Sequence, residues 1–149
     1  MQSEADPLVG KPKLRVLFLC TNNACRSQMA EGMLLHLAGD KFDVFSAGVE
    51  PTELHPLAVE IMAGLRIDIS GQRSKSAREF SDQQFDYIIT VCDWAKQTYP
   101  IFLGKHKKFH WPLEDPATVD GSESEELEAI RKAENQIQDN IWLFLEFLA

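Results

Sequence analysis

The sequence predicts an α/β fold in which a four-stranded parallel sheet has helices on both faces. Its apolar runs lack polar alternation, which is typical of strands buried on both faces, and stretches with helical periodicity separate them. Parallel strands need crossover connections, so strands that alternate with helices indicate a parallel sheet. The 149 residues are enough for one hydrophobic core and too few for two.

Four segments have the composition of strands. "LRVLFLC" is a continuous apolar run, and "FDVFSAG" is a short second strand. "FDYIITVC" is again an apolar run that ends in cysteine, and "KKFHW" is the fourth segment. We therefore expect strands over residues 14–20, 42–48, 85–92 and 107–111.

Helical patterns occupy the segments between and after these strands. We expect helices over residues 27–39, 55–65 and 93–99. A longer helix follows Ser122, which forms a capping-box pattern with Glu125. The apolar stripe of this last helix consists of Leu127, Ile130, Ile137, Ile141, Phe144 and Leu148.

The chain is acidic, with 23 Asp and Glu residues against 15 Lys and Arg residues and a net charge of −8. Such a charge repels nucleic acid and anionic membranes, so neither is an expected partner. No run approaches the roughly 18–20 apolar residues of a membrane span, and residues 1–13 lack the apolar core of a signal peptide. We expect a cytoplasmic monomer with a flexible leader over residues 1–13 and a single domain over residues 14–149.

Three cysteines, Cys20, Cys25 and Cys92, are candidates for chemistry. Their odd number argues against a disulfide framework. Their spacing provides no set of zinc ligands, so we expect no bound metal. The cysteines are therefore either inert core thiols or reactive thiols.

The segment from Cys20 to Arg26 favours a reactive thiol at Cys20. It joins a buried strand to a helix, so its backbone N–H groups can converge on an anion together with the helix N-terminus. Arg26 adds a planar cationic fork that suits a tetrahedral oxyanion, and the same field stabilises a thiolate. The expected substrate-binding residues are Thr21, Asn22, Asn23, Ala24, Cys25, Arg26 and Ser27.

The predicted topology brings distant residues to this loop. The carboxyl ends of parallel strands meet at one edge of a sheet, where ligands bind in such folds. Cys20 ends the first predicted strand, Cys92 ends the third, and Asp115 follows the fourth. We therefore expect the three side chains to share one edge of the sheet.

The segment "CTNNACRSQMAEG" resembles the low-molecular-weight phosphatase superfamily, and specifically its arsenate reductase branch. The resemblance runs from about Leu14 to the C-terminus and includes "FSAGVEP", "IDISGQRSK", "ITVC" and "HWPLEDPA". It implies a low-molecular-weight phosphatase-like fold with Cys20 as the nucleophile and Arg26 as the oxyanion clamp. Asp115 is then the general acid.

The resemblance also implies contacts that shape the loop. Ser27 donates a hydrogen bond to the Cys20 thiolate, and Asn23 bonds to Ser46. The alternative for Asn23 is a turn asparagine that tolerates positive φ. Cys25 is either a small buried side chain at the helix start or a backup partner for Cys20 under oxidation.

Several features favour the reductase branch over the tyrosine phosphatases. The phosphatases usually have proline after the R-S pair and aromatic residues after the D-P pair, whereas this chain has Gln28 and Ala117-Thr118. The cysteine that ends the third strand, Cys92, also favours a reductase. The alternative is a phosphatase that hydrolyses phosphate monoesters through a Cys20 phosphoenzyme. A non-catalytic oxyanion-binding or redox-sensing module is the third possibility.

Reduction of arsenate to arsenite needs two electrons, which a pair of thiols supplies by becoming a disulfide. In the reaction that the resemblance implies, Cys20 attacks arsenate, Cys92 attacks the Cys20 sulfur, and a Cys20–Cys92 disulfide remains. No cofactor is bound, and an external thiol reductant is required. Thioredoxin-coupled members have a third cysteine before a proline, where this chain has Tyr99. The reductant is therefore thioredoxin, glutaredoxin or a low-molecular-weight thiol that acts directly on the disulfide.

Lys75 is a further departure from the family. Some reductases have an acidic residue at this place, which helps to hold a potassium ion near the loop. An ammonium group at Lys75 would take the place of that cation. We therefore expect potassium to change neither stability nor activity.

Overall fold

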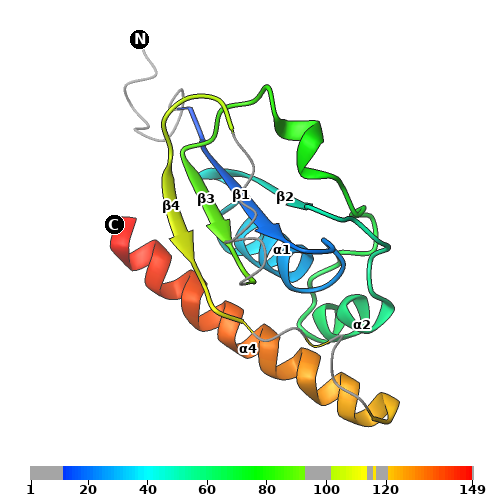
Figure 1. The fold of residues 1–149 in the computed structure, drawn as a ribbon. Coiled ribbons are helices and arrows are strands. Elements are labelled where there is room, and N and C mark those ends of the chain that lie inside the picture. The colour runs from blue at the N-terminus through cyan, green and yellow to red at the C-terminus, as the bar shows by residue number, and fades with distance from the viewer. Residues whose placement is uncertain (1–11, 93–101, 114–115, 117–120, 149) are drawn as a thin grey trace.

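The computed structural model describes residues 12–92, 102–113, 116 and 121–148 (Figure 1). The elements in chain order are β1 (Leu14–Cys20), α1 (Arg26–Ala38), β2 (Phe42–Gly48), α2 (Pro56–Gly64), the 3-10 helix η2 (Ala77–Phe80), β3 (Tyr87–Thr90), β4 (Lys107–His110) and α4 (Glu123–Leu148). The helix expected over residues 93–99 and the candidate acid Asp115 lie outside the described residues.

The four strands form one parallel sheet, as the sequence predicts, and the structure gives their order as β2-β1-β3-β4. β1 lies inside the sheet, and Val16, Leu17, Phe18 and Leu19 are fully buried. The chain moves from β1 to β2 on one side and later to β3 on the other, so the topological switch point lies at the carboxyl end of β1. Cys20 occupies this point, where such sheets bind their ligands.

Helices α1 and α4 pack against each other on one face of the sheet. Side chains alternate along β1, and Phe18 points to this face. Trp111 stacks on Phe18 with ring centroids 5.6 Å apart and also contacts Phe144 of α4. Figure 1 shows α4 running along the molecule, with its first turns near α2 and its last turns beside β4.

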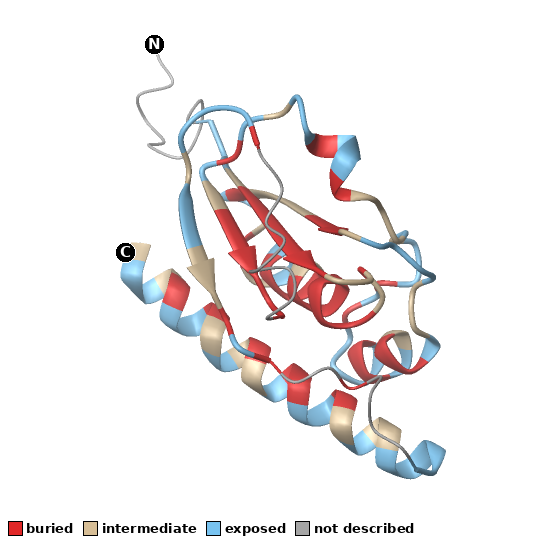
Figure 2. Ribbon diagram, in the orientation of Figure 1, coloured by how far each residue is buried: buried red, intermediate tan, exposed pale blue. Residues whose placement is uncertain are grey.

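The opposite face of the sheet is covered by η2 and the segments beside it. Phe45 of β2 packs against Phe80 of η2 and against Phe85, with centroids 5.6 and 5.7 Å apart. Phe102 extends this cluster through Phe85. Helical structure therefore lies on both faces, and the buried residues in Figure 2 concentrate on β1, β3 and α1 between them.

Helix α4 begins with the predicted capping box. The Glu125 N–H donates to Ser122 Oγ at 3.2 Å, and the Ser122 N–H donates to Glu125 Oε1 at 3.4 Å. The buried stripe of α4 includes four predicted residues, whereas Leu127 and Leu148 are half-buried at its margin. It also includes an unpredicted acid, Glu134, which is 3% exposed.

The predicted boundaries differ from the observed ones by one or two residues, as is usual at element ends. β3 begins at Tyr87, two residues later than predicted, and just before it the Asp86 side chain accepts a hydrogen bond from the Arg15 N–H at 2.8 Å. At the other end, the Val91 N–H still donates to the Leu19 carbonyl at 2.9 Å. β3 ends at Thr90, so Cys92 lies two residues beyond it. Among the helices of the described segments, none is both long and apolar enough to cross a membrane.

Candidate active site

The loop between β1 and α1 has its carbonyl groups turned outward. The carbonyls of Cys20, Thr21, Asn22 and Ala24 accept from the N–H groups of Val49, Glu50, Thr52 and His55 at 3.2, 2.8, 3.0 and 2.8 Å. In a planar trans peptide the carbonyl and the following N–H point in opposite directions, so the loop N–H groups face its interior. The Asn23 N–H accordingly donates to Cys20 Sγ at 3.2 Å. The loop therefore has the backbone geometry of an anion-binding nest, and anion binding by its residues stays a prediction.

The end of β2 supports the loop by close backbone contact. A Cβ atom on Gly48 would lie 2.7 Å from the Thr21 carbonyl oxygen and 2.8 Å from the Asn23 nitrogen. Real Cβ contacts are essentially never this short, so any larger residue at position 48 must displace the loop. Glycine at this position therefore allows the loop its observed shape.

Asn23 connects the loop to three neighbouring segments. Its side-chain oxygen accepts from the Lys75 N–H at 2.8 Å and from Gln28 Nε2 at 3.2 Å. Its side-chain nitrogen donates to Ser27 Oγ at 2.7 Å and to Ser46 Oγ at 2.9 Å. The backbone of Asn23 also has a positive φ of 51°. Asn23 therefore both bonds to Ser46 and is a turn asparagine with positive φ, as the two interpretations of the sequence proposed.

Ser27 is oriented toward the Cys20 sulfur. Because the Ser27 hydroxyl oxygen accepts from Asn23, its hydrogen is available to Cys20 Sγ, which lies 3.0 Å away. Cys20 is 2% exposed, and its sulfur lies beside Ser27 in the first turn of α1. The Ser27 hydroxyl, the Asn23 N–H and the helix dipole all favour negative charge on this sulfur.

Arg26, the first residue of α1, spans the carboxyl edge of the sheet. Its side chain is buried and donates to the carbonyls of Leu113 at 3.1 Å and Val91 at 3.4 Å. The guanidinium group therefore reaches from the loop to the segments that follow β3 and β4. Leu113 precedes Asp115 by two residues, but Asp115 itself is not among the described residues.

Cys92 approaches the loop through Thr21. Its Sγ atom lies 3.0 Å from Thr21 Oγ1, and the Cys92 residue is 4% exposed. The side chain of Thr21, an expected substrate-binding residue, is thus directed to Cys92. The side chain of Asn22 donates to the Glu50 carbonyl. A role of Thr21 and Asn22 in substrate binding therefore rests on their backbone N–H groups and stays a prediction.

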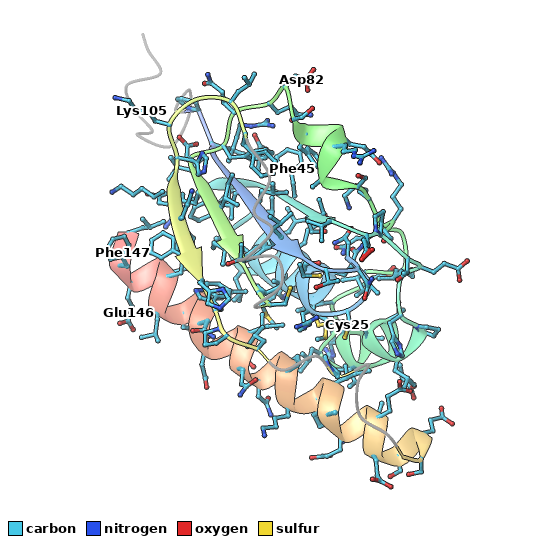
Figure 3. All side chains as sticks on the ribbon, in the orientation of Figure 1. Cys25, Phe45, Asp82, Lys105, Glu146 and Phe147 are labelled. Carbon is cyan, nitrogen blue, oxygen red and sulfur yellow. The ribbon has the colours of Figure 1, made fainter. Side chains whose placement is uncertain are left out.

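Cys25 lies immediately before α1 and is 6% exposed (Figure 3). Its carbonyl accepts from the Met29 N–H at 2.9 Å, so its backbone belongs to the first helical turn. This placement confirms the small buried side chain at the helix start. The role of backup partner stays a prediction. Cys20, Cys25 and Cys92 are all buried.

A partly buried ion pair lies behind the loop. The Ser46 hydroxyl donates to Glu31, whose carboxylate lies 3.7 Å from Lys75 Nζ. The Lys75 ammonium also donates to the Arg73 carbonyl at 2.7 Å. Burial raises the pKa of Glu31 and lowers that of Lys75, while each charge partly opposes the shift of the other.

Sequence reasoning missed the residues that hold the loop from behind. From the sequence, Gln28 indicates only which branch of the family the chain resembles. In the structure Gln28 is fully buried and donates to the carbonyls of Asn23 and Arg73, each at 2.9 Å. Gln72 donates in turn to the Gln28 side-chain oxygen at 2.7 Å. The sequence signal for this role was a polar residue, Gln28, on the buried side of the first turn of α1. No group of three or more potential metal ligands occurs within the described ranges.

A buried thiol inside a ring of backbone N–H groups, at the switch point of a parallel sheet, defines a cysteine-based oxyanion site. The comparisons give the family. Over residues 15–145 the sequence matches the family described as low molecular weight phosphotyrosine protein phosphatase, and the chain belongs to this family.

Relatives within the family include both branches. The chain is 38% identical over 129 residues to the arsenate reductase of Oceanobacillus iheyensis, which aligns 87% of this chain and 93% of that protein. A solved structure of an arsenate reductase in the oxidized state has a TM-score of 0.77 and 30% identity, covering 91% of this chain and 98% of the other. The solved structure of a low molecular weight protein tyrosine phosphatase from T. tengcongensis has a TM-score of 0.67 and 28% identity, and the match covers 87% of this chain and 98% of that chain.

Gly48→Ala should weaken oxyanion binding. The added methyl group displaces the backbone of the loop, which costs about 1–3 kcal/mol and should reduce phosphate affinity by roughly tenfold. Phosphate titration by calorimetry measures the effect. Gly71→Ala is the matched control, because a Cβ at Gly71 meets no atom within 4 Å. Unchanged affinity in Gly48→Ala would show that the loop shape does not depend on this contact.

Lys75→Met should destabilise the protein, because it leaves the partly buried Glu31 carboxylate without its cation. We expect a loss of about 2–3 kcal/mol in the free energy of unfolding. Glu79→Gln, which breaks the exposed Arg73–Glu79 pair, is the control and should leave the free energy of unfolding nearly unchanged, because water screens this pair. Denaturant unfolding measures both variants.

The wild-type protein should unfold identically in potassium chloride and in sodium chloride of equal ionic strength, because the ammonium of Lys75 already accompanies Glu31. A midpoint that rises specifically with potassium would contradict this expectation.

Proposed function

We propose that this protein reduces arsenate to arsenite with Cys20 as the nucleophile and Cys92 as the second thiol. The contact of 3.0 Å between Cys92 Sγ and Thr21 Oγ1 supports this function most directly. It brings a second thiol to the residue that follows the nucleophile, where hydrolysis of a phosphate ester would need none. Relatives named arsenate reductase, with one solved in an oxidized state, support the same choice.

In the first step the loop binds arsenate and Cys20 attacks it. The inward N–H groups and Arg26 take the negative charge of the oxyanion. The Cys20 thiolate forms a sulfur–arsenic bond while one arsenate oxygen leaves as water. We assign Asp115 as the acid that protonates the leaving oxygen, because it follows β4 and lies near Leu113 in sequence.

In the second step Cys92 resolves the adduct. Its thiolate attacks the Cys20 sulfur, a sulfur–sulfur bond forms, and the sulfur–arsenic bond breaks. The electron pair of that bond remains on arsenic, so As(V) becomes As(III) and arsenite leaves. The two thiols have then lost two electrons in becoming a disulfide, and the reaction balances without a bound cofactor.

An external thiol must return these electrons. Tyr99 stands where thioredoxin-coupled reductases have their third cysteine, so we propose that the reductant attacks the Cys20–Cys92 disulfide directly. Thioredoxin, glutaredoxin and a low-molecular-weight thiol are the candidates. Each is maintained in a reducing compartment, which supports a cytoplasmic location.

Cys92→Ser should abolish multiple-turnover reduction, because the variant lacks the thiol that releases arsenite. Arsenate-dependent NADPH oxidation measures turnover, coupled separately to the thioredoxin system, the glutaredoxin system and a small thiol with its reductase. Phosphate affinity should remain within about twofold of the wild type, because the loop backbone is intact. Cys25→Ser is the control that should retain turnover.

Two outcomes would contradict the proposed reaction. Undiminished turnover in Cys92→Ser would exclude the disulfide step. Efficient hydrolysis of an aryl phosphate, without arsenate-dependent reductant consumption in any coupled system, would identify a phosphatase.

Thr21→Val should slow the second step selectively. The variant loses the hydrogen bond to Cys92, which is worth about 1 kcal/mol and about fivefold in rate, but keeps the backbone N–H that faces the oxyanion. Rapid-quench measurement of disulfide formation tests the rate, and phosphate titration tests binding. Thr21→Ser retains a hydroxyl and should restore the rate. Equal losses in Thr21→Val and Thr21→Ser would contradict a role for the hydroxyl.

A further inference from the structure

Glu134 is a buried acid that the proposed reaction does not use. It lies in the apolar stripe of α4, one helical turn from Ile130 and Ile137, and is 3% exposed. Its Oε2 atom is closed to solvent and has no hydrogen-bond partner within the described part of the chain. Burial raises the pKa of the Glu134 carboxyl, and nearby Asp139 raises it further. A buried carboxyl group without a partner destabilises a fold, so this position calls for a partner.

A groove opens beside this carboxyl group. It has a volume of about 420 Å³ and lies between α2 and α4, which are neighbours in Figure 1. Ile61, Leu65 and Leu127 supply apolar surface, and Glu134 lines it together with them. Gly64 leaves the groove open, since a Cβ atom there would meet nothing within 4 Å. The volume is within the range of small-molecule sites.

The charges around the groove favour a cation. Glu60 on α2 and Glu134 on α4 supply carboxylates from its two sides. The cationic residue of the lining, Arg131, lies 3.6 Å from Glu128 on its own helix, and this pair is exposed. The groove therefore combines apolar contact surface with acidic groups, and for the Oε2 atom of buried Glu134 the described residues provide no hydrogen-bond donor.

We propose that the groove between α2 and α4 is a binding site for a small organic ammonium ion. The alkyl part of the ligand packs against Ile61 and Leu127, and the ammonium group donates to Glu134. The site is separate from the catalytic loop, since none of its lining residues belongs to residues 20–27. It therefore does not depend on the proposed reductase function.

The test is a titration of the full-length, isotope-labelled protein with n-butylammonium chloride in an amine-free buffer, followed by amide NMR. We expect saturable shifts at residues of α2 and α4 that line the groove, including Gly64. n-Butanol has the same alkyl chain without charge and should bind at least about tenfold more weakly. Sodium butyrate should cause no shifts there.

Two variants separate the ammonium contact from general packing. Glu134→Gln keeps the shape of the side chain but removes its charge, and should reduce n-butylammonium affinity by about tenfold or more. Gly64→Phe fills the groove and should abolish binding while Glu134 remains. Glu146→Gln is the matched control, because Glu146 is an exposed acid of α4 outside the groove lining, and it should change the affinity by less than about twofold.

Three results would overturn the proposal. They are the absence of saturable shifts in the groove, equal affinity for n-butanol, and unchanged affinity in Glu134→Gln. Circular dichroism verifies that each variant is folded. Because the titration needs no arsenate and no reductant, its outcome is independent of any failure of the reductase assay.

Discussion

The active loop depends on the outward hydrogen bonding of its carbonyl groups. Converging N–H groups repel one another, so the loop holds this shape only because donors outside it bind the opposite ends of the same peptides. Residues 49–55, which connect β2 to α2, supply most of these donors from their backbone. This connection is therefore part of the active site, although none of its side chains needs to touch the substrate.

The charges behind the loop decide which group donates in each hydrogen bond of the polar network there. Glu31 is held near the Lys75 ammonium and accepts from Ser46, so Ser46 must accept from Asn23. Asn23 also donates to Ser27, which leaves the Ser27 hydroxyl hydrogen for Cys20. A positive charge at Lys75 thus helps to orient donors toward the sulfur through neutral groups in between.

The strands, the start of α4 and the loop after β1 could be predicted from the sequence, because each depends on residues that are close together in the chain. Apolar runs gave the strands, and Ser122 with Glu125 gave the start of α4, since each pattern depends on a few neighbouring residues. The nest followed from a short polar loop between a strand and a helix. Contacts across the chain could not be predicted in this way. Gly48 and the partners of Gln28 are close to the loop only after folding, and Glu134 occupies an apolar stripe where periodicity predicts an apolar residue.

The step from a phosphatase-like site to a reductase site is small in structural terms. The backbone of Thr21 contributes to the oxyanion nest, and its side chain contacts Cys92, so one residue serves both parts of the proposed reaction. In the proposed reaction, a second thiol just beyond β3 converts bond cleavage at the loop into electron transfer, because it attacks sulfur where water would attack the bound oxyanion. The fold that binds the oxyanion is the same in both cases. The chemistry is then decided by which nucleophile reaches the Cys20 adduct first, and the position of Cys92 beside Thr21 favours the thiol.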